Sequence, residues 1–214
     1  MTKEAPLAVN VELRDGSKVV IRPVFPDDKD LLREGFHRLS DESRYRRFRV
    51  PINELSESQL RYLTEIDHVN HMAWVALDTA DQDEAALGVA RYVRLADDPS
   101  AAEAAVVVAD SYQGRGLGTL LLGLLGLSAR ENGINWFRAY VQEDNRTMLE
   151  ILKDLGGTVS LEEPGLLRVD LSLPGDPEEL PDTPTGRVFK AIAKQVLPPF
   201  PVEFRLLPLD RLSD

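Results

Sequence analysis

Residues 104–119 of this 214-residue chain read AAVVVADSYQGRGLGT. An apolar run that favours a β-strand ends at Asp110, alternating glycines follow at positions 114, 116 and 118, and an apolar helix pattern begins at once. Glycine lets bare backbone approach a ligand, and the first N–H groups of a helix have no partner inside the helix. Because the helix dipole adds positive charge at the same end, this stretch predicts a binding site for phosphate.

Two common phosphate-binding loops do not fit this stretch. A Walker loop needs a lysine before its Ser or Thr, whereas here Gly118 directly precedes Thr119. The dinucleotide fingerprint needs a further glycine at the position that Leu121 occupies. On these residues alone, a plain glycine-rich turn remains the alternative to a ligand site.

The sequence on both sides of the loop predicts a mixed α/β (α+β) domain. Strands that first follow one another in a meander and then alternate with helices are typical of this class. The expected strands are Val9–Leu13 and Val19–Val24 around an Asp-Gly turn, Ala73–Asp78 and Ala86–Leu95 around an acidic turn at Thr79–Glu84, Ala102–Ala109, Trp136–Gln142, Val159–Leu161 and Leu166–Leu171. The expected helices begin near Pro26 and Ser56, follow the glycine loop to about Asn132, and run from Asn145 to Leu155.

Composition excludes several classes of function. With 25 Lys plus Arg against 36 Asp plus Glu, the net charge is −11, which argues against a nucleic-acid partner. The chain has no cysteine, so disulfides, thiolate zinc sites and thiol nucleophiles are excluded. The first ten residues lack an apolar signal segment, and the apolar run Leu117–Leu127 is far shorter than the roughly 20 residues of a membrane span. We expect a cytoplasmic protein with no membrane partner.

The chain is expected to divide near residue 174. Residues 1–173 hold the elements above, whereas residues 174–186 contain four prolines and four acidic residues, which is typical of a linker. Beyond it, Val188, Ile192 and Val196 follow helical spacing, and an apolar segment, Leu206–Leu209, comes near the end. We expect residues 174–214 to form a linker and a helical tail that packs on the domain or on a partner, including a second copy in a homodimer.

The glycine loop, QGRGLG at residues 113–118, resembles the Gln/Arg-x-x-Gly-x-Gly/Ala pyrophosphate loop of the GNAT superfamily of N-acetyltransferases. The element order resembles that family from Val19 to Leu171. The resemblance implies a GNAT fold, whose mixed, mainly antiparallel sheet is flanked by helices and splayed at the acetyl-CoA site, and it implies acetyl-CoA as co-substrate. The residues that it assigns to acetyl-CoA are Val106, Val107, Val108, Gln113, Gly114, Arg115, Gly116, Leu117, Gly118, Thr119 and Asn145. Asn is also a good helix N-cap, so Asn145 alone does not decide the matter.

A narrower resemblance concerns two stretches before the loop. Residues 39–48 (LSDESRYRRF) and 63–67 (LTEID) are similar to the acetyltransferase domain of bacterial protein-lysine acetyltransferases of the Pat type. This resemblance implies a protein lysine as the acceptor. It also implies a general base shortly before the loop, and Glu103 matches that position.

A carboxylate at position 103 fits the chemistry of amine acylation. An amine attacks a thioester only as the free base, and lysine has a pKa of about 10.4, so another group must accept its proton. We expect burial in an Ala/Val strand to desolvate this carboxylate and make it a stronger base. Strand alternation puts Glu103 on one face with Ala105 and Val107, which leaves space for an amine. The alternative from the residues alone is an edge-strand glutamate that points into water.

The family mechanism implied here is direct attack by the amine, because no cysteine is available as an acyl carrier. The backbone N–H of Val108 would meet the oxyanion. Many family members have a tyrosine as general acid where Leu152 stands, so that role stays unassigned. His68 and His71 lack a third ligand, so no metal is expected. Two alternatives remain open: an acetyltransferase for a small amine, such as an amino acid or polyamine, and a non-catalytic acyl-CoA-binding regulatory protein.

Overall fold

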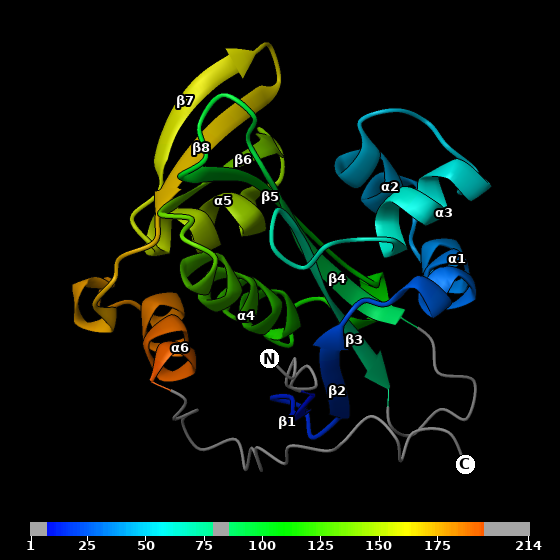
Figure 1. Cartoon of the computed structure of the whole chain (residues 1–214), viewed down its shortest axis with the longest axis horizontal. Helices are drawn as coiled ribbons and strands as arrows, with labels where there is room; N and C mark the ends of the chain where they lie inside the picture. Colours follow the sequence, from blue (N-terminus) through cyan, green and yellow to red (C-terminus); the bar gives the residue numbers. More distant parts are fainter. Residues whose placement is uncertain (1–7, 79–85, 195–214) are drawn as a thin grey trace.

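A single sheet forms the centre of the molecule (Figure 1). The computed structural model describes residues 8–78 and 86–194, and in these residues eight strands lie in the order β1-β2-β3-β4-β5-β6-β8-β7. The strands are β1 (Val9–Glu12), β2 (Lys18–Pro23), β3 (His71–Asp78), β4 (Ala86–Arg94), β5 (Ala101–Val108), β6 (Trp136–Gln142), β7 (Thr158–Glu163) and β8 (Leu166–Ser172). All neighbouring pairs are antiparallel except β5 and β6. The expected mixed, mainly antiparallel α/β fold is confirmed.

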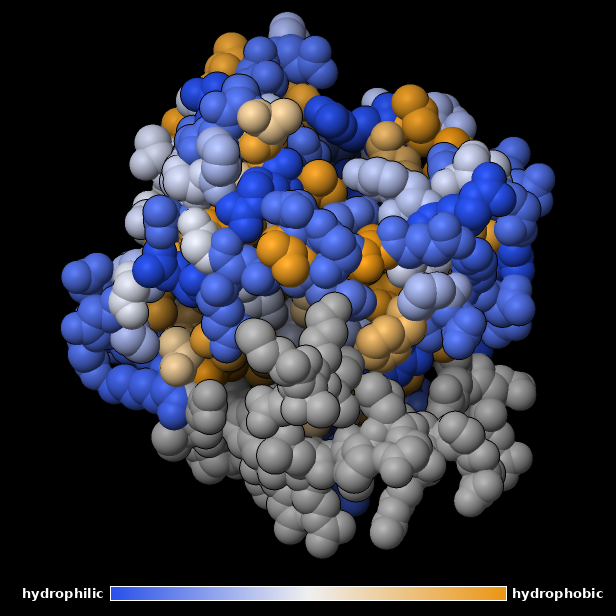
Figure 2. All heavy atoms as spheres, viewed as in Figure 1, coloured by the Kyte–Doolittle hydropathy of each residue, from blue (hydrophilic) through white to orange (hydrophobic). Residues whose placement is uncertain are grey.

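Helices cover both faces of this sheet (Figure 1). One group consists of α1 (Lys29–His37), α2 (Asp41–Phe48) and α3 (Glu57–Thr64), and the other of α4 (Leu117–Glu131), α5 (Arg146–Asp154) and α6 (Pro184–Ala193). Single 3₁₀ turns lie at Pro26–Asp28, Asp110–Tyr112 and Pro177–Glu179. The first group buries Leu32, Phe36 and Leu60, while its outer surface over α1 and α3 is largely hydrophilic (Figure 2). In the residues described, no helix is both long and apolar enough to cross a membrane.

The helix α2 was not predicted from the sequence. Ser40 is its N-cap, and the Ser40 hydroxyl accepts a hydrogen bond from the Ser43 N–H at 3.2 Å. Arg49 ends the helix in the left-handed conformation, with φ of 58°. Ser43 is the one buried residue of this helix. Because α2 therefore lacks a buried apolar stripe, hydrophobic periodicity gives no signal for it.

The strands β5 and β6 pair over three residues and then separate. Residues 101–103 of β5 lie opposite residues 136–138 of β6. Beyond this point β5 stays paired with β4 as far as Val108, and β6 stays paired with β8 as far as Gln142. Within the described residues, the β6-facing edge of β5 therefore has no strand partner between Glu103 and Val108. This opening is the expected splay of the sheet.

The chain returns to the domain after the last strand. Thr183 caps α6, and its hydroxyl donates a hydrogen bond to the Asp154 carbonyl oxygen at 2.7 Å. Phe189 and Ile192 are buried against α4, where a Cβ on Gly123 would collide with the Ile192 side chain. The turn at Thr79–Glu84, Val196 and the Leu206–Leu209 segment lie outside the described residues.

We expect Phe189→Ala to lower the free energy of unfolding by about 3–5 kcal/mol, because loss of the buried ring leaves a cavity between α6 and α4. Urea unfolding followed by circular dichroism measures this change. Arg187→Ala on the same helix is the control: its side chain is 58% exposed, and the cost should stay within about 0.5 kcal/mol. If Phe189→Ala cost no more than this control, α6 would not be packed on α4 in solution.

Candidate active site in the splay of the sheet

A cavity of about 590 Å³ lies in the splay between β5 and β6. Its walls come from β5, the glycine loop and first turn of α4, β6, α5 and the last turn of α2. A volume of this size is typical of a site for a small-molecule ligand or cofactor.

Ten of the twelve predicted site residues line this cavity: Glu103, Val106, Val107, Val108, Gln113, Gly114, Gly116, Gly118, Thr119 and Asn145. The other two point elsewhere. The Leu117 side chain is fully buried in the core under α4. The Arg115 guanidinium forms an ion pair with Asp15 in the β1–β2 turn and lies 4.5 Å from the centre of the Tyr112 ring. Neither residue is part of the cavity lining, so any contact of these two residues with a ligand there would come from their backbone N–H groups.

The glycine loop presents the N-terminus of α4 to the cavity. Gly114 and Gly116 have φ of +74° and +91°, a conformation that L side chains rarely adopt. Gly116 is the N-cap of α4, and because glycine has no side chain it leaves the first N–H groups of the helix uncapped. These donors and the helix dipole make this end of the cavity suited to an anion such as phosphate.

The glycine loop is held against α2 by hydrogen bonds. The Asp110 carboxylate accepts from the Ser40 N–H (2.9 Å), the Ser40 hydroxyl (2.8 Å) and the Ser43 hydroxyl (3.0 Å). Although burial acts in the opposite direction, these bonds hold the pKa of Asp110 below its usual value. Gln113 Nε2 donates to the Val108 carbonyl oxygen at 3.1 Å and to the Ser43 hydroxyl at 3.3 Å. Ser40, Ser43 and Asp110 are functional neighbours that sequence reasoning missed, since their contacts join residues far apart in the chain.

Glu103 lies where the two strands part. It faces Arg138 in the last β5–β6 pair, and its side chain is exposed, while Ala102 and Ala104 on the opposite face are buried. The expected burial and desolvation of this carboxylate are therefore wrong. The physical reason is that β5 and β6 separate directly after Glu103, so this side chain lies at an open vertex.

The α5 side of the cavity offers an amide but no hydroxyl at the position expected for a general acid. Asn145 is the N-cap of α5, and its Oδ1 accepts from the Met148 N–H at 3.3 Å, so it acts as a helix cap as well as lining the cavity. Leu152 is buried and also lines the cavity. Tyr140 of β6 contributes a phenol to the lining, with the Arg49 guanidinium 5.2 Å from its ring centre.

Four arginines line the cavity: Arg14, Arg46, Arg47 and Arg49. Arg46 is neutralised by Glu42 at 2.5 Å and by Asp144 at 3.6 Å. Arg14 lies beside the glycine loop, because a Cβ on Gly116 would be 3.7 Å from Arg14 Nε. Arg14 has no hydrogen bond or ion pair with any residue that the structure describes.

The two histidines noted in the sequence, His68 and His71, lie just before β3 and at its first residue. His71 contacts Arg91, with Nε2 and Nη1 2.7 Å apart. Across residues 8–78 and 86–194, no group of three or more His, Asp or Glu residues is arranged to hold a metal ion.

Comparison with known proteins gives a matching family model and two similar acetyltransferases. The family model described as "Acetyltransferase (GNAT) domain" matches residues 18–158. Acetyltransferase Pat of Mycolicibacterium smegmatis is 35% identical over 170 residues, which cover 78% of this chain and 49% of that protein, so this chain spans about half of its length. Acetyltransferase PA5475 of Pseudomonas aeruginosa is 36% identical over 144 residues, covering 67% of this chain and 77% of that protein.

The fold comparison agrees. The crystal structure of the GNAT domain of S. lividans PAT superposes with a TM-score of 0.70 at 32% identity, covering 77% of this chain and 96% of that domain. The sequence match, the splayed sheet and the uncapped glycine loop agree with one another, and the chain belongs to the GNAT acetyltransferase family.

Proposed function

We propose that this chain transfers an acetyl group from acetyl-CoA to a primary amine, and that the acceptor is a lysine side chain of a protein. The observation that carries the proposal is the cavity in the splay, with the uncapped N-terminus of α4 in its wall and Glu103 at its vertex. Membership of the GNAT family supports the donor, and similarity to proteins named Pat supports the lysine acceptor. Because acetyl-CoA is an intracellular donor, a cytoplasmic location accompanies this proposal.

Acetyl-CoA would bind along the free edge of β5. Its pantetheine amides would pair with the backbone of Val106 and Val108, as an added strand does, and Asn145 would contact the same arm. The pyrophosphate would rest on the N–H groups of Gly114–Thr119. A strand rises about 3.3 Å per residue, so Val108 lies about 16 Å from Glu103, which leaves length for an extended arm between the phosphates and the reacting carbonyl.

Arg14 is our candidate for the side chain that neutralises the CoA phosphates. It lies beside Gly116 and is free of partners among the described residues. Arg115, the arginine inside the motif, is already engaged by Asp15. Charge-assisted contacts from guanidinium to phosphate are among the stronger hydrogen bonds in proteins.

The acceptor amine would attack the thioester carbonyl carbon as the free base. A C–N bond forms, the amine proton passes to the Glu103 carboxylate, and the C–S bond breaks to release the CoA thiolate, which takes a proton from solvent. Val108, whose backbone N–H the family resemblance implies for the oxyanion, lies too far along β5 from Glu103 to contact a carbonyl beside that carboxylate, so the oxyanion donor stays unassigned. A thiol has a pKa of about 8.5, so its thiolate leaves readily even though Leu152 supplies no proton.

The exposure of Glu103 suits an acceptor that arrives from outside. A lysine on another protein can reach a carboxylate at the open vertex, whereas a deeply buried base would be closed to it. When donor and acceptor are bound, they would exclude water from around this carboxylate.

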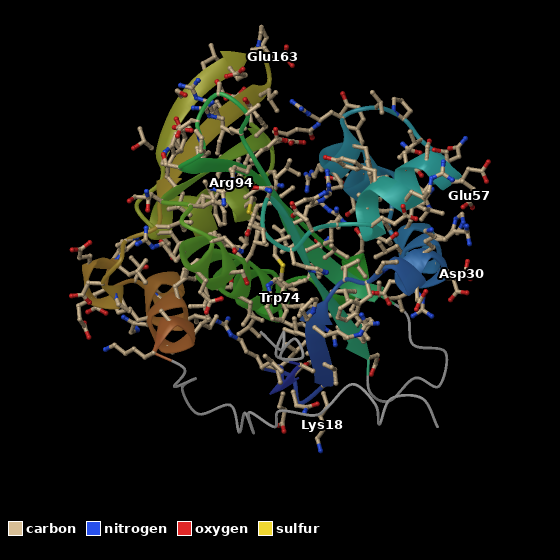
Figure 3. All side chains as sticks on the ribbon, in the orientation of Figure 1. Lys18, Asp30, Glu57, Trp74, Arg94 and Glu163 are labelled. Atoms are coloured by element: carbon tan, nitrogen blue, oxygen red, sulfur yellow. The ribbon has the colours of Figure 1, made fainter. Side chains whose placement is uncertain are left out.

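The proposal predicts that Glu103→Gln lowers kcat/KM by about 10²–10⁴-fold, because the amide cannot accept the amine proton. The affinity for acetyl-CoA should stay near that of the wild type. Glu163→Gln is the matched control, since Glu163 ends β7 at the far tip of the β7–β8 hairpin (Figure 3) and is not part of the cavity lining. CoA-thiol release measures turnover, and equal turnover of the two variants would remove Glu103 from the mechanism.

A second variant pair tests the glycine loop. We expect Gly116→Val to raise the Kd for acetyl-CoA roughly a hundredfold, because its side chain occupies the space that the phosphates need beside the α4 N-terminus. Gly133→Val introduces the same side chain at φ of +76° outside the cavity. Both variants carry a similar backbone strain of about 1–2 kcal/mol, but only Gly116→Val should lose binding by calorimetry. Equal affinities would contradict the loop assignment.

The role of Arg14 is tested with two ligands. Arg14→Ala should raise the Kd for acetyl-CoA about tenfold and leave the Kd for S-acetyl-pantetheine, which lacks the phosphates, unchanged. Arg61→Ala removes the same charge from the exposed face of α3, away from the cavity, and should change neither Kd. If Arg14→Ala weakened both ligands equally, or neither, Arg14 would have no contact with phosphate.

A further inference from the structure

A second, smaller recess opens beside the large cavity. It has a volume of about 60 Å³ and lies between the α1–α3 group and strands β4 and β5. The large cavity and the recess share Arg47, Phe48 and Val107 as wall residues. Val107 belongs to the same face of β5 as Glu103, and the Glu103 charge acts on Arg47, so the recess adjoins the face of β5 on which Glu103 lies.

The walls of the recess are apolar except for two guanidinium groups. Buried aliphatic and aromatic side chains make up most of the lining: Leu32, Phe36, Leu39, Leu55, Leu63, Ala86 and Leu87. The two polar groups come from Arg47 at the end of α2 and from Arg91 in the middle of β4. An apolar recess with a few convergent polar groups is the usual form of a small-ligand site.

Arg91 is a buried cation without a counter-charge. It is 5% exposed, and it donates to the Leu63 carbonyl oxygen at 3.0 Å and to His71 Nε2 at 2.7 Å. Guanidinium has only donors, so the His71 nitrogen must accept and the ring is neutral. In agreement, burial and the nearby Arg91 charge lower the pKa of His71 to about 4. No carboxylate of the described residues lies within ion-pair distance of Arg91.

Arg47 adds a second positive charge at the junction of the two cavities. Its guanidinium lies 5.1 Å from the centre of the Phe48 ring, and it forms no ion pair within residues 8–78 and 86–194. Burial lowers the pKa of Arg47, the Glu103 and Tyr62 groups act in the opposite direction, and Arg49 adds to the lowering. Burial and the Arg47 charge likewise lower the pKa of Arg91 to about 9, so Arg91 stays cationic at neutral pH.

Two such cations side by side are costly unless an anion joins them. A buried charge without a partner is destabilising, and the planar guanidinium fork matches a carboxylate in two parallel hydrogen bonds. One water-sized position needs about 15 Å³, so the recess holds about four such positions. That is more than the methyl group of an acetyl chain fills, and it suits a short chain that ends in a carboxylate.

We propose that this recess is an acyl-chain pocket, and that the chain accepts short acyl-CoA donors whose acyl group ends in a carboxylate, such as malonyl-CoA and succinyl-CoA. The inference rests on the proposed function, because it needs the acyl-CoA in the splay. We assign the carboxylate to the donor because the recess, with a volume of about 60 Å³, is too small for an acceptor lysine with its backbone. The reaction is otherwise unchanged: the amine nitrogen bonds to the carbonyl carbon, the C–S bond breaks, and the amine proton goes to Glu103.

Calorimetry with the full chain tests the pocket, using acetyl-, butyryl-, malonyl- and succinyl-CoA as ligands. We expect succinyl-CoA or malonyl-CoA to bind at least about tenfold more tightly than butyryl-CoA, which is the gain of one charge-assisted contact. If butyryl-CoA bound as tightly as both carboxylated donors, the pocket would be merely apolar and the proposal would be overturned. Equal affinity for all four ligands would overturn it as well. If none of the four binds, the proposed function itself fails, which is a different result.

Variants of Arg47 then link the preference to the recess. Arg47→Gln should lower the ratio of succinyl-CoA to butyryl-CoA affinity about tenfold, and Arg47→Lys, which keeps the charge but loses the fork, should restore part of it. Arg61→Gln on α3 is the charge-matched control and should leave the ratio at its wild-type value. Circular dichroism checks that each variant is folded. An unchanged ratio in folded Arg47→Gln would overturn the assignment of the carboxylate to Arg47.

Discussion

The separation of β5 from β6 directly after Glu103 is the constraint on which the rest of the site depends. It leaves backbone donors and acceptors of β5 without a strand partner in the described part of the chain, and an edge of this kind is a template for an added strand. It also opens the cavity and exposes Glu103 at the vertex. The binding edge and the candidate base therefore arise from one feature of the sheet.

Hydrogen bonds and an ion pair between segments that are distant in the chain hold the glycine loop in place. Asp110 holds the glycine loop against α2 through Ser40 and Ser43, while the pair of Asp15 with Arg115 holds it against the β1–β2 turn. Because the loop is fixed from both sides, the N–H groups of α4 are set in position before a ligand arrives. Such preorganisation reduces the ordering cost of binding.

Much of the fold and part of the site could be predicted from the sequence, because those signals are local. The alternating glycines predicted a loop before a helix, and the period-2 pattern around Glu103 predicted which side chains share its face. The α2 helix could not be predicted in this way, since it buries no apolar stripe. The ion pair of Arg115 with Asp15 could not be predicted either, because the two residues are one hundred positions apart in the chain. The exposure of the Glu103 side chain depends on the point at which β5 and β6 separate. The residue composition of these strands does not determine that point.

Acetylation of a protein lysine is tested most directly by CoA-thiol release from acetyl-CoA in the presence of different amines. The panel would contain a folded protein with accessible lysines such as an acyl-CoA synthetase, lysine peptides, free amino acids and polyamines. We expect release with the protein acceptor, and mass spectrometry should detect an acetyl group on its lysine. Release only with a small amine would contradict the protein acceptor, and bound acetyl-CoA with no release from any amine would contradict catalysis itself.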